Sequence, residues 1–200
     1  VSIAGSMRRK KETVGDIDIL ASCRGDKAAA KIMGFFTAIP EVARILAKGG
    51  TKASILLKTG LQVDLRVVDD ASFGAALQYF TGSKEHNVVV RELAIRKGLK
   101  LNEYGVFRKP GNRKIAGKTE QEVYRAIGLK YMEPEIRENS GEVEAAAKNK
   151  LPNLIEYGSM RGDFHTHTVK SDGANSLADM VAAAKKLGYE YVAITDHSRS

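Results

Sequence analysis

The chain has 200 residues, of which 43% are apolar, and a formal net charge of +8 from 32 basic and 24 acidic side chains. This length allows one large or two small domains with a hydrophobic core. A single cysteine, Cys23, excludes a disulfide framework within the chain and favours a reducing, intracellular setting. No apolar run approaches the roughly 18 residues of a membrane span, and no signal peptide is visible. Because the chain begins and ends within motifs, we interpret it as a fragment truncated at both ends.

Positive charge gathers in the middle of the chain. Residues 84–130 carry 12 basic and 5 acidic side chains, whereas residues 131–160 carry 3 basic and 6 acidic ones. A basic surface of this kind indicates a polyanionic partner, with nucleic acid as the leading candidate. The alternative is a basic face that is merely solvated.

The elements predicted for residues 1–70 are those of a small α/β domain. Asp26 is placed to cap one helix, and Pro40 near the first position begins another, which Gly49 and Gly50 end. Thr59-Gly60 lies between two β-rich runs and indicates a hairpin. The predicted elements are a strand at 16–22, helices at 26–39 and 40–50, and a hairpin at 53–68.

After residue 70 the pattern changes twice. Residues 71–137 are more helical and more basic, with a strand predicted at 101–107, and residues 138–158 suit an acidic connector between domains. A new pattern covers residues 159–200, with a helix capped by Ser176 between two strands. This order predicts a βα unit whose polar residues fall at strand ends.

A pair of carboxylates stands at the start of the first predicted strand. Residues i and i+2 of a strand project from one face, so Asp16 and Asp18 lie side by side. Two carboxylates this close repel each other unless a cation lies between them. Asp64 lies on a strand that could pair beside the first, and three carboxylates together suit Mg²⁺ or Mn²⁺.

The residues just before this strand suit an anion. Gly5 and Ser6 offer backbone amides and a hydroxyl, and residues 8–11 are four consecutive cations. Donors and carboxylates this close together predict a site for phosphate and divalent metal. The alternative is a strand-entry turn with solvated aspartates and a basic loop.

The stretches that carry these residues resemble a known family. AGSMRRKKETVGDIDIL and VDLRVV look like the nucleotidyltransferase palm of family X DNA polymerases, and YFTGSKEHNVVVRELAIRKGLKLNEYGVF resembles the thumb of the same family. The resemblance implies a palm at 1–70, truncated at its N-terminus, and a thumb at 71–137. It also implies that Asp16, Asp18 and Asp64 are catalytic metal ligands, with Asp64 nearest the primer 3′-hydroxyl.

The same resemblance assigns the remaining polymerase residues. The implied triphosphate contacts are Gly5, Ser6, Arg9 and Gly15. The residues implied to lie around the incoming nucleotide are Tyr79, Phe80, Gly82 and Asn87. The implied DNA contacts are Arg91, Arg66 and Lys84, and Arg66 and Glu103 match a pair that responds to subdomain closure.

Three positions depart from the vertebrate pattern of this family. Val14 replaces a serine that contacts phosphate, Lys84 replaces an acid that packs on the incoming base, and Gln62 replaces an arginine beside the third carboxylate. These departures bear on substrate discrimination and leave the metal site intact.

A second set of metal-binding residue types lies near the end of the chain. His165 and His167 are spaced to chelate one Zn²⁺ or Mn²⁺, Asp172 offers an oxygen, and Asp196 and His197 follow an apolar strand. A lone His-x-His pair is otherwise common on surfaces. The segment resembles the start of a PHP (polymerase and histidinol phosphatase) domain, which is a distorted βα barrel.

This second resemblance implies roles for the same residues. His165, His167, Asp172 and His197 are implied metal ligands, with Asp196 in a supporting role. His86, the remaining histidine, receives no metal role.

A family X polymerase joined to a PHP domain is the architecture of the bacterial and archaeal branch of the family. It implies a gap-filling repair DNA polymerase acting on gapped or primer-template DNA and dNTPs, with a PHP 3′→5′ exonuclease in the full-length protein. We expect a cytoplasmic, nucleoid-associated monomer with no membrane contact. The rival hypotheses are a DNA-end binding module with an inactive polymerase and a different nucleotidyltransferase.

Overall fold

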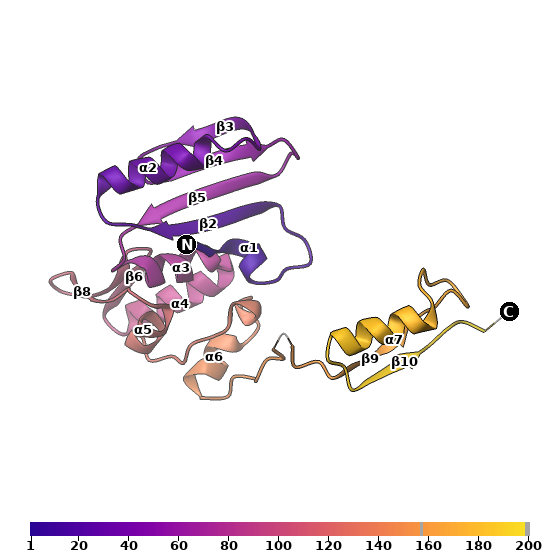
Figure 1. Ribbon diagram of the computed structural model, residues 1–200. Coiled ribbons are helices and arrows are strands. Elements are labelled where there is room, and N and C mark those ends of the chain that lie inside the picture. Colours follow the sequence, from indigo (N-terminus) through magenta and orange to yellow (C-terminus); the bar gives the residue numbers. More distant parts are fainter. Residues whose placement is uncertain (157, 199–200) are drawn as a thin grey trace. The chain divides into compact units, whose positions relative to one another are not determined.

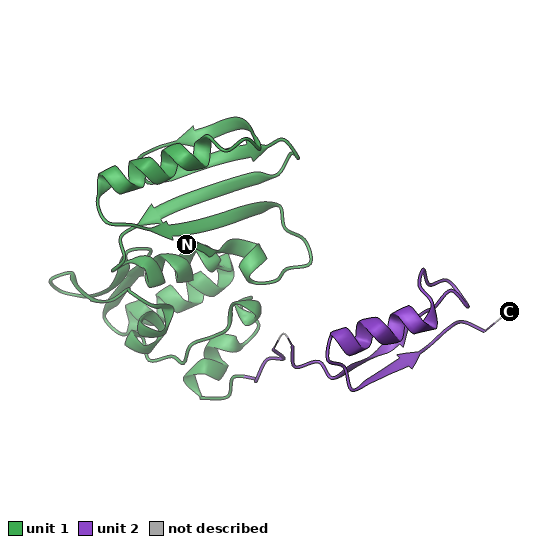
Figure 2. Cartoon of the chain, viewed as in Figure 1, with its two compact units in different colours: residues 1–151 green, residues 152–200 purple. Residues whose placement is uncertain are grey.

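The computed structural model describes residues 1–156 and 158–198, and the chain divides into two compact units, Val1–Leu151 and Pro152–Ser200 (Figure 2). Residues 157, 199 and 200, which belong to the predicted connector and PHP segment, lie outside the described residues. None of the helices in the described part of the chain is long and apolar enough to cross a membrane.

The first part of unit 1 is a mixed sheet that carries helix α2 on one face (Figure 1). Among the described residues its strands run in the order β1-β2-β5-β4-β3, and only β2 and β5 pair in parallel. Met33 and Phe36, three positions apart on α2, pack against Ile55 and Leu65 of the sheet. The elements are β1 (Ser2–Ile3), α1 (Gly5–Arg8), β2 (Asp16–Ser22), α2 (Asp26–Thr37), β3 (Val42–Lys48), β4 (Lys52–Leu57) and β5 (Gln62–Val68).

The structure confirms the strand at 16–22, the first helix and the hairpin, but the predicted helix at 40–50 is wrong. Residues Val42–Lys48 form edge strand β3, which pairs antiparallel with β4. The run is too short for helical and strand patterns to be separated by apolar spacing, and pairing with β4 satisfies its backbone groups. The cap prediction is also wrong, because Gly25 is the N-cap and Asp26 is the first helical residue of α2.

The rest of unit 1 is a helical layer with a small antiparallel sheet. Its core includes Val90, Ala94, Val106, Tyr124 and Ile127. The elements are α3 (Phe73–Thr81), α4 (Lys84–Arg96), β6 (Leu99–Asn102), β7 (Gly105–Arg108), β8 (Arg113–Ala116), α5 (Glu120–Ala126), the 3₁₀ helix η1 (Pro134–Ile136) and α6 (Glu142–Ala147).

Two features of this layer differ from the sequence prediction. The segment 101–107 is not one strand, because it contains the end of β6, a two-residue turn at 103–104 and the start of β7. In this turn the Tyr104 N–H donates to Asn102 Oδ1 at 3.1 Å. Residues 138–151, predicted as connector, belong to unit 1, because Val143 and Ala146 of α6 are buried in its core.

Unit 2 contains the predicted βα unit. Strands β9 (Gly162–Thr166) and β10 (Tyr191–Ile194) pair in parallel, with α7 (Leu177–Lys186) between them in sequence. The predicted cap is confirmed: the Ser176 hydroxyl accepts from the Asp179 N–H, and the Asp179 carboxylate accepts from the Ser176 N–H. The barrel-like continuation stays a prediction, because these elements alone do not close a barrel.

Candidate functional site: a carboxylate cleft in unit 1 and a histidine cluster in unit 2

The three predicted carboxylates of unit 1 come together on neighbouring strands. In the parallel pairing of β2 with β5, Asp18 lies opposite Asp64, and Asp16 lies opposite Gln62. Asp16 and Asp18 share one face of β2 because they are two residues apart. Gln62 donates a 3.1 Å hydrogen bond from Nε2 to Asp64 Oδ1 and so orients the third carboxylate.

Electrostatics at this point favour a bound cation. Burial raises the pKa of Asp18, and the charges of Asp16 and Asp64 raise it further, whereas Arg9 and Arg66 lower it. A divalent cation between the carboxylates would relieve this repulsion. Carboxylate oxygens are donors that Mg²⁺ and Mn²⁺ prefer. In the described part of the chain, the group whose ligand atoms already lie within 4.8 Å of one another is the one in unit 2.

Position 5 has to be glycine, because its backbone lies too close to the Asp18 carboxylate for any side chain. It has φ +61°, and a Cβ atom added there would lie 2.2 Å from Asp18 Oδ2. Only glycine leaves this space free and adopts the backbone conformation without strain. The backbone of α1 therefore approaches the carboxylates closely, as a phosphate cradle beside a metal site requires.

A cleft of about 380 Å³ brings most of the predicted polymerase residues together. Within the described residues its walls come from α1, β2, α3 and α4 and the turn that joins α3 to α4. The lining residues are Gly5, Ser6, Arg9, Asp16, Asp18, Tyr79, Phe80, Thr81, Gly82, Lys84, Asn87 and Arg91. Gly15, a predicted triphosphate contact, does not line this cleft. Asp64, a predicted metal ligand, does not line it either, but it lies opposite Asp18 in the strand pairing.

Hydrogen bonds hold the side chains that face this cleft. Arg9 donates from Nη1 to the Thr81 carbonyl at 2.6 Å and from Nε to Glu138 Oε1 at 2.7 Å. Asn87 donates to the Tyr79 carbonyl at 2.7 Å and accepts from Gln78 at 2.6 Å. Hydrogen bonds therefore hold both the guanidinium of Arg9 and the side-chain amide of Asn87 in place in the cleft.

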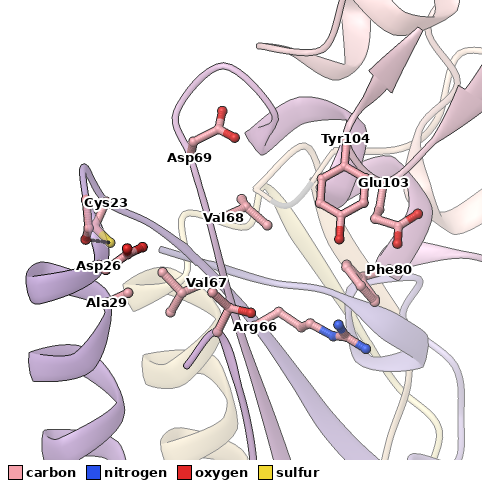
Figure 3. Close-up of a pocket in the computed structure, with 12 residues that line it drawn as sticks. Cys23, Asp26, Ala29, Arg66, Val67, Val68, Asp69, Phe80, Glu103 and Tyr104 are labelled. Atoms are coloured by element: carbon pink, nitrogen blue, oxygen red, sulfur yellow. Dashed lines mark hydrogen bonds between the residues drawn. The ribbon is translucent and has the colours of Figure 1, made fainter. Parts of the chain in front are cut away.

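Arg66 lies on a second cavity, of about 300 Å³, together with Phe80 and Glu103 (Figure 3). Its guanidinium carbon is 4.8 Å from the centroid of the Phe80 ring. Phe80 also lines the carboxylate cleft, so its ring belongs to both cavities. Arg66 and Glu103 thus line one cavity, and neither lines the carboxylate cleft. Their match to a pair that responds to subdomain closure stays a prediction.

Sequence reasoning missed the buried ion pairs beside this cleft. Glu120 accepts from Arg8 at 2.9 and 2.6 Å and from Arg137 at 2.6 Å, and the Arg137 and Glu120 side chains are 0% and 4% exposed. Although burial opposes it, the hydrogen bonds and charges of Arg8 and Arg137 lower the pKa of Glu120. These residues are far apart in the sequence, so no spacing could reveal them.

His86, which received no role from the sequence, is a buried residue of unit 1. It is 0% exposed, with Nδ1 at 2.6 Å from Glu142 Oε1 and Nε2 at 2.9 Å from the Tyr124 hydroxyl. Burial lowers its pKa against the opposing hydrogen bond of Glu142. We assign a neutral ring that donates from Nδ1 to Glu142 and accepts at Nε2 from Tyr124.

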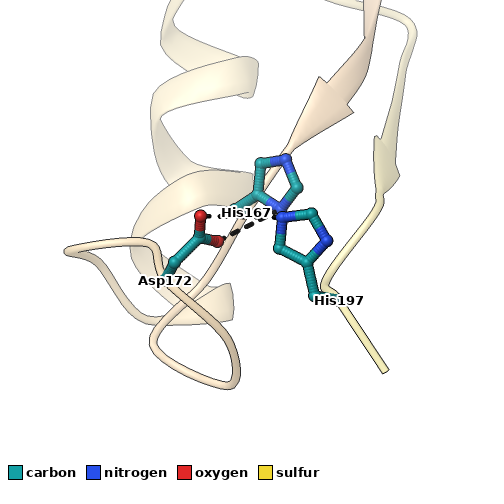
Figure 4. Close-up of side chains that lie close together, drawn as sticks. All are labelled: His167, Asp172 and His197. Atoms are coloured by element: carbon teal, nitrogen blue, oxygen red, sulfur yellow. Dashed lines mark ion pairs between the residues drawn. The ribbon is translucent and has the colours of Figure 1, made fainter. Parts of the chain in front are cut away.

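In unit 2, three of the four predicted ligands form a cluster in which each offers an atom within 4.8 Å of the others (Figure 4). His167 Nδ1 is 3.4 Å and His197 Nε2 is 3.6 Å from the carboxylate oxygens of Asp172. His167 Nδ1 is buried and has no hydrogen-bond partner in the described part of the chain. An unsatisfied ring nitrogen facing a carboxylate and a second imidazole fits a transition metal ion. His165 lies outside this cluster, with its ring centroid 5.0 Å from that of His167.

Asp196 supports this cluster without joining it. Its carboxylate accepts hydrogen bonds from Thr168 N at 2.6 Å, Thr168 Oγ1 at 2.7 Å and Ser171 Oγ at 2.8 Å. These bonds hold the loop between His167 and Asp172. Asp196 therefore positions both of those side chains.

Comparisons with known proteins agree with this geometry. Residues 76–138 match the DNA polymerase beta thumb family, and residues 163–199 match the PHP domain family. The chain is 38% identical to "DNA polymerase/3'-5' exonuclease PolX" of Bacillus subtilis over 99% of its own length and 34% of that protein. It is 30% identical to DNA polymerase lambda of Rattus norvegicus, over 67% of this chain and 28% of the relative.

Solved structures give the same result for the fold. Leishmania infantum polymerase beta in a ternary P/T complex aligns with a TM-score of 0.59 and 26% identity, covering 68% of this chain and 66% of the other. Its ternary gap complex gives a TM-score of 0.58 and 25% identity, covering 68% and 61%. The chain spans about a third of the length of these two curated relatives, from Bacillus subtilis and Rattus norvegicus. With its α/β palm, its thumb and the PHP match that follows them, the chain belongs to the family X DNA polymerases that carry a PHP domain.

Proposed function

We propose that the chain is the palm, thumb and first PHP segment of a DNA-directed DNA polymerase that fills short gaps during DNA repair. The observation that carries this proposal is the parallel register that sets Asp18 opposite Asp64 beside a cleft lined by Gly5, Ser6 and Arg9. The solved relatives hold primer-template or gapped DNA, which supports the same substrate class here. Monomeric state and a cytoplasmic, nucleoid-associated location belong to this proposal.

Each side of the cleft has a separate task. Ser6 and Arg9 bind the triphosphate, and the Gly5 backbone gives it room beside Asp18. Two bound divalent ions would neutralise phosphate charge and lower the pKa of the attacking hydroxyl. Asp64 faces the primer 3′-hydroxyl, which attacks the α-phosphate as pyrophosphate leaves.

The thumb side of the cleft selects and holds the substrate. Tyr79 and Phe80 pack against the sugar, and their rings meet edge to face at a centroid distance of 5.0 Å. Asn87, fixed by two hydrogen bonds, reaches the base-pair edge, and Arg91 and Lys84 contact DNA. Because these DNA contacts are mainly to phosphates, binding should weaken steeply with salt.

A second activity, 3′→5′ phosphodiester cleavage, is proposed for the PHP part of the full-length protein. The cluster of His167, Asp172 and His197, with its unsatisfied Nδ1, favours it. These residues would hold Mn²⁺ or Zn²⁺, which supplies a nucleophilic water when bound.

Primer extension tests the polymerase proposal. The full-length protein is given labelled DNA with a one-nucleotide gap and Mg²⁺ or Mn²⁺, beside the variants Asp64→Ala and Glu41→Gln, an exposed palm acid outside the cleft. Loss of a metal ligand should reduce templated extension about a thousandfold, since metal ions supply several kcal/mol of charge stabilisation. The Glu41→Gln variant should extend normally.

Two results would contradict the proposal. DNA that is bound or trimmed from its 3′ end but never extended favours the binding-module or nuclease hypothesis. Extension without preference for the templated nucleotide favours another nucleotidyltransferase.

A further inference from the structure

We propose that Glu138 is a positioning residue of the polymerase cleft, whose carboxylate holds the Arg9 guanidinium in the orientation that binds the triphosphate. The inference rests on the proposed polymerase function and adds to it a residue at the last position of the thumb match, to which the sequence motifs gave no role. It assigns to the segment after η1 an effect on nucleotide binding that acts through Arg9.

The geometry of Arg9 carries the first step. Its Nε donates to Glu138 Oε1 at 2.7 Å, its Nη1 donates to the Thr81 carbonyl at 2.6 Å, and its side chain is only 13% exposed. Two bonds to different atoms of a planar guanidinium fix both its position and its plane. The remaining N–H groups are then available to a phosphate in the cleft that Arg9 lines.

The position of Glu138 is itself fixed from the thumb side. Four residues later, Glu142 accepts hydrogen bonds from Asn139 N at 3.0 Å and Ser140 N at 2.8 Å, and lies 2.6 Å from buried His86 Nδ1 on α4. The turn at residues 138–142 is therefore tied to the helix that also presents Asn87. Glu138 thus links the phosphate-binding arginine to the base-pair side of the same cleft.

The opposite role, in which Glu138 competes with the triphosphate for Arg9, predicts the opposite sign. A positioning carboxylate strengthens nucleotide binding, so its removal weakens binding. A competing carboxylate weakens nucleotide binding, so its removal strengthens binding.

Equilibrium binding of the correct dNTP to the full-length protein separates these roles. The protein is bound to gapped DNA with a dideoxy-terminated primer and Mg²⁺, so that no chemistry occurs. Glu138→Ala should raise the dNTP Kd about fivefold, the scale of a partly exposed charge-assisted contact. Glu138→Gln should raise it less, because the amide oxygen still accepts from Arg9 Nε.

The matched control is Glu135→Gln. Glu135 lies in η1 and pairs with Lys10 Nζ at 2.7 Å, and neither residue lines the cleft. The dNTP Kd of the Glu135→Gln protein should equal that of the wild type if Glu138 acts through Arg9. If loss of an ion pair merely destabilised the segment around η1, the Kd would rise in both Glu135→Gln and Glu138→Ala.

A double-mutant cycle with Arg9→Ala decides the mechanism. In the Arg9→Ala protein, Glu138→Ala should have no further effect on the dNTP Kd. A Kd that falls in Glu138→Ala, that is unchanged, or that rises independently of Arg9 overturns the inference. Failure of the wild-type protein to extend a normal primer would overturn the polymerase proposal instead.

Discussion

Asp18 and Asp64 lie opposite each other on two hydrogen-bonded strands, whereas His167, Asp172 and His197 lie on segments that follow strands. In the first site the backbone ladder of a sheet sets the spacing of the ligands. In the second site, side-chain hydrogen bonds to Asp196 set the shape of the loop between two ligands. Two candidate metal sites thus differ in what places their side chains, which is main-chain pairing in unit 1 and the single carboxylate of Asp196 in unit 2.

The largest expected effect concerns how much a buried ion pair contributes to the stability of unit 1. Glu120→Ala would leave buried Arg137 without its carboxylate partner and should lower the local unfolding free energy by about 3–5 kcal/mol. The matched change in unit 2 is Glu190→Ala. The Glu190 side chain and that of its partner Arg161 are 55% and 69% exposed, so solvent screens this ion pair and its loss should have a much smaller effect.

Hydrogen exchange on the full-length protein measures both effects separately. In Glu120→Ala, protection of backbone amides from exchange should fall in α5 and around Arg137. In Glu190→Ala, amide protection in unit 2 should change little. Equal losses in the two variants would show that burial does not distinguish these ion pairs.

The second prediction compares the supports of the two metal sites. Asp196→Asn should weaken Mn²⁺ binding at the His167 cluster about 10–100-fold, the usual effect of losing a group that orients metal ligands. Gln62→Ala removes one hydrogen bond to Asp64 and should have a smaller effect on Mn²⁺ binding at the cleft, since strand pairing still places the carboxylate.

Titration of Mn²⁺ into the full-length protein measures both affinities, with Asp179→Asn as the control in unit 2. Asp179 belongs to the helix cap and lies outside the cluster. A Gln62→Ala effect as large as that of Asp196→Asn would contradict the proposed difference.

The sequence predicted the parts of the sites that depend on local spacing. The i, i+2 pattern of Asp16 and Asp18 and the hairpin that carries Asp64 were enough to anticipate the carboxylate cluster. The Ser176 cap was also visible, because its partner Asp179 is three residues away.

Contacts between distant segments were not predictable. Arg8 and Glu120 are 112 residues apart, and Arg9 and Glu138 are 129 apart. The helix predicted at 40–50 failed for a related reason, since pairing with β4 decides the conformation of a short apolar run. Tertiary pairing thus supplies what local pattern cannot.

The smallest expected effect concerns pH and the buried histidine of unit 1. Because burial lowers the pKa of His86 below its usual 6.5, the unfolded chain binds a proton more readily than the folded one. Stability from this group is therefore present above about pH 6.5 and declines as the pH falls below that value. Glu142 opposes this shift and Arg137 adds to it.

Hydrogen exchange of α4 between pH 7.5 and pH 5 measures this decline once intrinsic exchange rates are subtracted. His86→Gln should flatten the slope, because the amide does not titrate in this range. An unchanged slope in that variant would assign the pH dependence to other groups.

The most direct test of the account is manganese anomalous scattering from crystals of the full-length protein with gapped DNA, a blocked primer and the correct dNTP. We expect Mn²⁺ within about 2.2 Å of carboxylate oxygens of Asp16 and Asp18, with Asp64 binding one of the ions. Manganese at the His167 cluster alone, with none beside Asp64, would contradict a polymerase site on β2 and β5.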